Sequence, residues 1–80
     1  MSQPFPQLND GQVVLSRVDN NTGIILDELF QYAVHLDQSV YTIYNDLSQA
    51  LEEAKLIVKD NPDIECYIHD RDQILLYRFD

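Results

Sequence analysis

The side chains with the most chemical potential in this chain are a single cysteine, Cys66, and two histidines, His35 and His69. A nucleophilic cysteine needs a nearby base that holds it as a thiolate. Cys66 and His69 are three residues apart in an alternating apolar and polar segment, so a regular strand sends their side chains to opposite faces. An enzyme that uses Cys66 is therefore the least favoured interpretation.

Acidic side chains gather near the C-terminus and offer the oxygen ligands that hard cations prefer. They are Asp63, Glu65, Asp70 and Asp72. The segment has neither the glycine nor the ligand spacing of a calcium-binding loop, so solvated loop acids are the simpler explanation. The chain contains only two glycines, which rules out a glycine-rich phosphate loop, and it has no zinc-type spacing of cysteine and histidine. We predict no catalytic residue, no metal and no cofactor.

Five tyrosines suggest a binding surface, because tyrosine combines a large apolar area with a polar tip and is enriched at interfaces. The candidate protein-binding residues are Tyr32, Tyr44, Tyr67 and Tyr77, with Asp70 and Asp72 as an acidic rim. Core packing and strand preference offer a competing explanation for the tyrosines. The hypothesis requires a sheet face that no helix covers.

A capped amphipathic helix is predicted from Asp46 to about Asp60. The Asp46 carboxylate can accept from amides of the first turn, and Gln49 is placed to complete a capping box. One apolar stripe follows helical spacing: Leu47, Ala50, Leu51, Ala54, Ile57 and Val58. Pro62 disfavours helical geometry at Asn61 and ends the helix.

A strand pair is predicted after the helix. Ile64, Cys66 and Ile68 alternate with polar or aromatic residues, as in a strand with one buried face. Residues 69–73 form a polar break without glycine, and the apolar run from Ile74 to Phe79 then closes a hairpin as an edge strand.

The N-terminal half is predicted to contain an arm and further strands. Met1 to Gly11 holds two prolines and forms an irregular arm, anchored by Phe5 or Leu8. Gln12 to Asp19 is a short β-branched strand, residues 20–23 supply turn chemistry, and a hairpin continues into Ile24.

The stretch from Ile24 to Leu36 fits two templates. Alternation of apolar residues favours a strand with a bulge or kink near Asp27 to Leu29, whereas Leu26, Leu29, Phe30 and Ala33 also align on one side of a helix. We favour the strand, because its pattern covers more residues. Val40 to Tyr44 is a further β-rich run that leads into the helix cap.

These elements predict an α+β fold of the order βββαββ. An antiparallel sheet of four to five strands carries one helix on one face, which makes a two-layer domain. Strands grouped around a single helix do not form repeated βαβ units, so a parallel nucleotide-binding sheet is not expected. Residues 1–80 are predicted to form a single domain, and a partner can add stability to a chain this short.

Net charge is the outstanding global property. Fourteen acidic residues against five Lys and Arg give a net charge of −9. Such a field repels phosphate, so neither nucleic acid nor an anionic membrane is an expected partner, whereas a basic protein would be attracted. Solubility alone also explains acidity. Because no apolar run approaches 18 residues and no secretory signal is recognisable, we expect a cytoplasmic protein.

The segment from Tyr41 to Phe79, with its run YTIYNDLSQALEEAKLIVKDNPDIECYIHD, resembles small uncharacterised bacterial α+β proteins, some of which are similar to immunity proteins of toxin systems. The resemblance implies a non-catalytic binding partner and transfers no functional residue. Our leading hypothesis is a protein-binding module, an acidic immunity or inhibitor protein for a basic partner. The alternative is a structural or accessory homo-oligomer.

Overall fold

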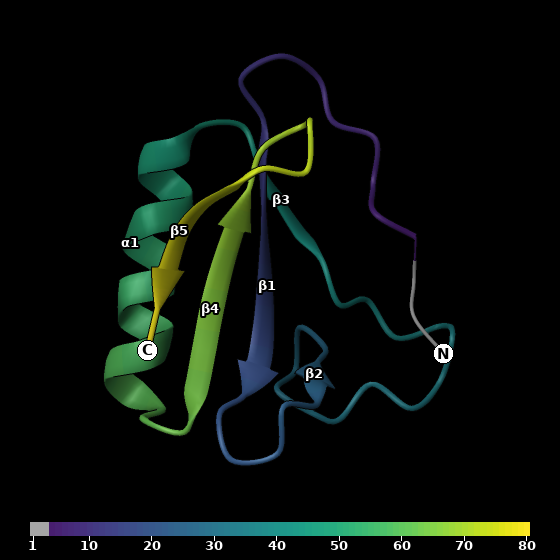
Figure 1. Ribbon diagram of the computed structural model, residues 1–80, viewed down its shortest axis with the longest axis vertical. Coiled ribbons are helices and arrows are strands. Elements are labelled where there is room, and N and C mark those ends of the chain that lie inside the picture. Colours follow the sequence, from purple (N-terminus) through teal and green to yellow (C-terminus); the bar gives the residue numbers. More distant parts are fainter. Residues whose placement is uncertain (1–3) are drawn as a thin grey trace.

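The structure is a computed structural model that describes residues 4–80 (Figure 1). Its elements are β1 (Val13–Asp19), β2 (Ile25–Leu26), β3 (Thr42–Tyr44), α1 (Leu47–Asp60), β4 (Ile64–His69) and β5 (Leu75–Phe79). The order βββαββ is confirmed. Among the described residues, no helix has both the length and the apolar character that crossing a bilayer requires.

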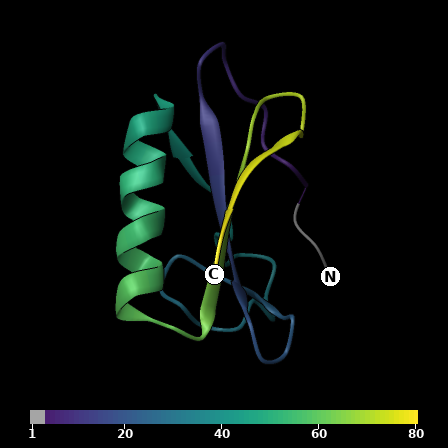
Figure 2. The same cartoon turned by 60° about the vertical axis from the view of Figure 1, so that its left-hand side comes forward.

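Strand β1 is the centre of an antiparallel sheet. Along one side it pairs with β4, and β5 continues the sheet beyond β4. Along the other side it pairs with β3 opposite Val13 to Leu15 and with β2 opposite Arg17 and Val18. Helix α1 covers one face of this sheet (Figure 2). The predicted two-layer α+β fold with five strands is confirmed.

The core lies between α1 and the face of the sheet that it covers. The Asp46 carboxylate accepts a hydrogen bond of 2.9 Å from the amide of Gln49, as predicted for the N-cap. Ala50, Ala54 and Ile57 of the predicted stripe are buried. They pack in one cluster with side chains from the strands: Val13, Leu15, Leu26, Ile64, Cys66 and Ile68.

The opposite face of the sheet is partly covered by the N-terminal arm, which runs on the side away from α1 (Figure 2). The ring of Phe5 meets those of Tyr41 and His69 edge to face, with centroids 5.7 and 6.1 Å apart. Leu8 is also buried. Residues 4–11 have no regular structure and are anchored as predicted, while residues 1–3 of the predicted arm lie outside the described residues.

The predicted strand from Ile24 to Leu36 is wrong, and so is the helical alternative. Only Ile25 and Leu26 form a strand, followed by an isolated bridge between Leu26 and Tyr32. The reason is Asp27, whose carboxylate accepts from the amides of Leu29 (2.8 Å) and Gln31 (2.9 Å). These bonds give the backbone an alternative to a strand ladder, so a polar-centred loop forms instead.

The C-terminal hairpin turns without glycine, as predicted. Asp70 Oδ1 accepts from the amides of Asp72 (2.9 Å) and Ile74 (3.0 Å), and Gln73 takes the left-handed conformation with φ 63°. The register between β4 and β5 shifts next to Ile68, which places a bulge in the pair. Strand β5 is the edge of the sheet, as the sequence predicts.

Candidate functional site

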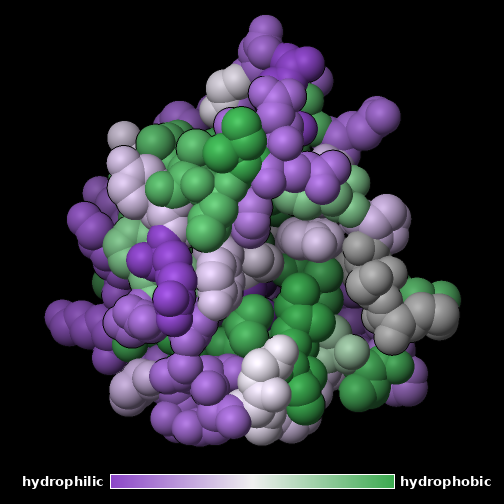
Figure 3. Space-filling view, in the orientation of Figure 1, coloured by the Kyte–Doolittle hydropathy of each residue, from purple (hydrophilic) through white to green (hydrophobic). Residues whose placement is uncertain are grey.

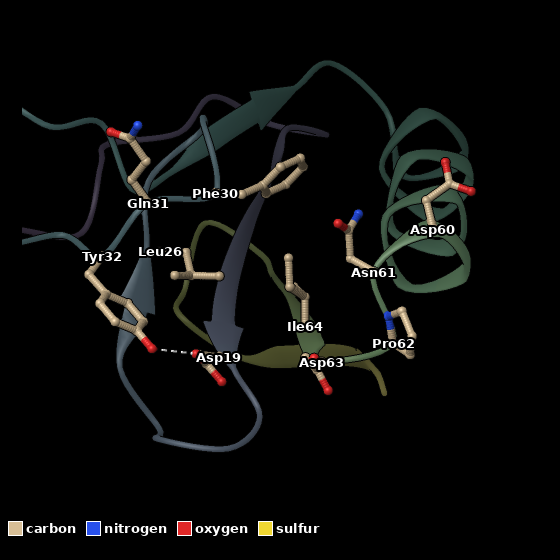
Figure 4. A pocket seen from close by; sticks show the side chains of 10 residues that line it. All are labelled: Asp19, Leu26, Phe30, Gln31, Tyr32, Asp60, Asn61, Pro62, Asp63 and Ile64. Carbon is tan, nitrogen blue, oxygen red and sulfur yellow. Dashed lines mark hydrogen bonds between the residues drawn. The ribbon is translucent and has the colours of Figure 1, made fainter.

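A cleft of about 650 Å³ lies between the loop that follows β2 and the junction of α1 with β4 (Figure 4). Its lining residues are Asp19, Leu26, Phe30, Gln31, Tyr32, Asp60, Asn61, Pro62, Asp63 and Ile64. The apolar side chains of Leu26, Phe30 and Ile64 face one another across it in Figure 4. The cleft therefore has an apolar floor with polar groups around it.

The loop wall of the cleft is shaped by Asp27. Besides accepting from two loop amides, its Oδ2 accepts from Gln38 Nε2 at 2.8 Å. These hydrogen bonds, led by the one from Gln31, lower the pKa of Asp27. Phe30 sits within this turn at φ 63°, and its amide donates to the Asp27 carbonyl at 3.1 Å. An aromatic residue rarely takes this left-handed backbone conformation, and here the conformation directs the Phe30 ring into the cleft.

Tyr32 and Asp19 form the polar end of the same wall. The Tyr32 hydroxyl donates to Asp19 Oδ2 at 2.7 Å (Figure 4), and the Asn21 amide donates to Asp19 Oδ1 at 2.8 Å. Because both bonds favour the ionised carboxylate, they lower the pKa of Asp19, and the Tyr32 contact is the larger cause. The same contact raises the pKa of Tyr32. Asp19 thus stays an anion at the edge of the cleft.

The helix wall is built by the C-cap of α1. The amide and the side-chain Nδ2 of Asn61 both donate to the Ile57 carbonyl, at 2.9 and 3.0 Å. Pro62 follows and turns the chain toward β4, so Asp60 and Asp63 flank the turn and are both exposed. The Asn20 amide donates to the Asp63 carbonyl at 2.7 Å and ties this wall to the β1–β2 turn.

The charge of the cleft is entirely negative. Three of its lining residues, Asp19, Asp60 and Asp63, are acidic, and none of the ten is basic. An apolar floor below carboxylates suits a cation carried on an aliphatic stem, such as a lysine or arginine side chain, and an aromatic wall can add a cation–π contact. None of the lining residues is a serine, threonine, cysteine, lysine or histidine. Within residues 4–80, no group of three or more His, Cys, Asp and Glu is placed to hold a metal ion.

A second polar cluster lies beside the core and was not predicted. Arg17 is only 2% exposed on the α1 side of the sheet, next to Cys66 and Leu26 in the register. Its Nη2 donates to Thr42 Oγ1, and that hydroxyl donates to Glu28 Oε2 at 2.7 Å. Arg17 Nη1 is buried and has no hydrogen-bond partner within the described part of the chain. The only sequence signal was one basic residue inside a β-branched strand.

The structure does not bring the four candidate tyrosines together. Tyr32 lies in the cleft, and Tyr67 lies on the face away from α1, where its hydroxyl donates to Glu65. Tyr44 and Tyr77 are on the α1 side, the first packed against the core and the second 44% exposed on β5. No single tyrosine surface forms.

The other sequence candidates are also separate. Asp70 and Asp72 belong to the hairpin turn, where Asp70 supports the backbone. Cys66 is fully buried in the core, and burial raises the pKa of its thiol to about 11, which keeps it protonated at neutral pH. His69 contacts Phe5 on the face away from α1, and His35 lies in the exposed loop. Cys66 and His69 lie on opposite faces, as strand parity predicts.

No protein-family model matches the chain, and neither a curated protein nor a solved structure does. The geometry of the cleft is therefore the basis for a functional assignment.

Proposed function

We propose that this protein is a non-catalytic binding module for a basic protein partner, and that the cleft between residues 26–32 and 60–64 receives a lysine or arginine side chain of that partner. An immunity or inhibitor protein is the form of such a module that the sequence resemblance implies. It acts in the cytoplasm, where its single cysteine stays reduced, and it binds neither nucleic acid nor membrane.

One observation carries the proposal: three of the ten residues that line a cleft with an apolar floor are acidic, and none of the ten is basic. A basic side chain gains there in two ways, because its stem covers Leu26 and Ile64 while its charge meets Asp19, Asp60 and Asp63. The net charge of −9 adds long-range attraction, which increases the association rate of a basic partner. The pKa of Asp19 is lowered, so this carboxylate remains charged in mildly acidic conditions.

The first test uses small probes. N-acetyl-arginine methylamide is titrated into ¹⁵N-labelled protein, with N-acetyl-norleucine methylamide as the uncharged control of similar stem length. We expect amide shifts within residues 26–32 and 60–64 for the arginine probe alone. Equal responses to both probes would refute the electrostatic part of the proposal, and shifts elsewhere would refute the site.

The second test uses the natural partner, captured from cells with the intact chain as bait. The double variant Asp60→Asn with Asp63→Asn removes two cleft charges whose carboxylates make no hydrogen bond within the described residues. The double variant Glu52→Gln with Glu53→Gln removes the same charge from an exposed part of α1. We expect the cleft variant to weaken binding by about 3- to 10-fold and the helix variant by less, and added salt to weaken binding further.

Truncation of Phe30 tests whether the apolar side chains of the cleft contribute to binding. Phe30→Ala removes a large side chain from the cleft, and a loss of affinity of about tenfold or more is expected for an anchor residue. Leu29→Ala, at the neighbouring and 75% exposed position, is the control. If both variants bind as the parent does, the cleft is not the binding site.

A further inference from the structure

Strand β5 and the residue before it expose an unusual amount of apolar surface. Ile74 is 57% exposed, and Leu75, Leu76 and Tyr77 are 48%, 38% and 44% exposed. Figure 3 shows hydrophobic side chains gathered over the first half of β5. The outer side of β5 has no neighbouring strand among the described residues. Natural proteins usually protect such an edge with charge or cover, so this one is suited to a partner.

Residues 71–80 differ from the rest of the chain in charge. Residues 71–80 hold Arg71 and Arg78 against Asp72 and Asp80, which gives zero, so residues 1–70 carry the whole net charge of −9. Both arginines are also paired. Arg78 Nη2 lies 3.3 Å from Glu65 Oε1 and 3.2 Å from Asp80 Oδ2, and Arg71 pairs with Asp10. Two copies of an acidic chain repel each other least where residues 71–80 of one copy meet residues 71–80 of the other.

We propose that β5 is the contact surface between two copies of this chain, related by a two-fold axis. The exposed apolar side chains of Ile74, Leu75 and Leu76 pack against the same residues of the second copy, as an isologous interface requires, whereas Tyr77 lies on the α1 side and is outside this contact. Residues 71–80 have no excess of acidic residues that would attract a basic partner. An uncharged and apolar surface on an otherwise acidic chain instead matches its own copy. This site is separate from the acidic cleft and does not depend on the function proposed for it.

The size of the surface sets the strength of the contact. Three apolar side chains at about half exposure offer on the order of 300 Å² per copy, well below the roughly 800 Å² per partner of a standard interface. The bulge next to Ile68 also interrupts the regular edge, which limits strand pairing between copies. The dimer is therefore expected to be weak.

Sedimentation equilibrium of the intact chain tests the proposal. We expect the average mass to rise from 9.3 kDa toward twice that value with concentration. The rise should be larger in 0.5 M salt, because screening reduces the repulsion between two negative chains. Binding of a basic partner at the cleft has the opposite salt dependence, so failure of either proposal is recognised separately.

The variant Ile74→Lys with Leu75→Lys should remain at 9.3 kDa, while Leu29→Lys, an exposed apolar position outside the hairpin, should dimerise as the parent does. A concentration series of amide spectra of the unmodified chain gives a readout that needs no variant, with shifts expected in residues 74–79. A chain that stays monomeric near 1 mM in 0.5 M salt, or shifts confined to other residues, would overturn the proposal.

Discussion

Replacing the buried Arg17 by methionine should leave the protein as stable as before or more stable. Methionine keeps an unbranched apolar stem in the core and removes the guanidinium. In the folded protein Arg17 is 2% exposed. Desolvation lowers the pKa of its guanidinium, although the negative charge of Glu28 acts to raise it. Arginine stays charged at ordinary pH, so folding carries the cost of burying this cation.

The expected change in the free energy of unfolding follows from the interactions that Arg17 makes and from those that it lacks. Its Nη1 is buried without a hydrogen-bond partner among the described residues, which costs about 1 to 3 kcal/mol in addition to desolvation. The variant gives up the bond from Nη2 to Thr42, worth about 1.5 to 3 kcal/mol. Thr42 still donates to Glu28, which is exposed. The buried Asp27 loses the favourable charge of Arg17 but keeps its hydrogen bonds from Leu29, Gln31 and Gln38. These two contributions nearly cancel, from about 2 kcal/mol against the variant to about 1.5 kcal/mol in its favour. The desolvation cost that methionine avoids then brings the expected net change to between zero and about 2 kcal/mol in favour of the variant.

Urea unfolding followed by circular dichroism measures this change. With a slope of about 1 kcal/mol/M for a small domain, the midpoint should rise by up to about 2 M. Arg17→Ala, which also deletes the stem, should be less stable than the methionine variant. Arg78→Met is the surface control: its side chain is 52% exposed, and its ion pairs are worth at most about 1 kcal/mol. If Arg17→Met lowers stability by more than about 1 kcal/mol, the cation is stabilising and our reasoning is wrong.

Three further predictions concern the cap, the cleft and the thiol. Asp46→Ala should lower the free energy of unfolding by about 1 kcal/mol, whereas Asp46→Ser keeps a capping oxygen and should lose less; equal losses would argue against the cap. The lowered pKa of Asp19 means that its contribution to stability is complete above its ordinary pKa of 3.8 and disappears as the pH falls through the folded value. Tyr32→Phe should therefore destabilise at pH 7, by an amount that shrinks below pH 3.8, and a pH-independent difference would contradict this cause. Cys66, with a pKa of about 11, should react with a disulfide reagent at pH 8 roughly 100-fold more slowly than in urea, judged by thiolate fraction against an ordinary pKa of 9.0. Fast reaction of the native thiol would instead favour the enzyme hypothesis.

Local patterns were sufficient to predict the helix, β1, β4, β5 and the two-layer fold. In α1 the apolar spacing and the burial agree, since Ala50, Ala54 and Ile57 repeat with helical period, and in β4 the buried Cys66 and Ile68 flank the half-buried Tyr67. Strands β1 and β5 do not show such alternation, because five consecutive residues of β1 are buried and four of the five residues of β5 are exposed, so they were predicted from their β-rich and apolar composition. The loop after β2 was mispredicted because its apolar residues also alternate. Of these, Val34 is 73% and Leu36 60% exposed, so their alternation did not reflect a buried face. A single aspartate, Asp27, outweighed the pattern through bonds to backbone amides.

The sequence by itself determined the fold class, the capped helix and the negative charge, since these depend on the spacing of neighbours and on counts of ionisable residues. The cleft and the buried Arg17 were decided only by tertiary structure. The cleft residues come from three separate segments, near Asp19, 26–32 and 60–64, and no pattern within a segment records that they meet. Whether an arginine in a strand faces water or the core depends likewise on which neighbours surround it, and Thr42 lies 25 residues away along the chain.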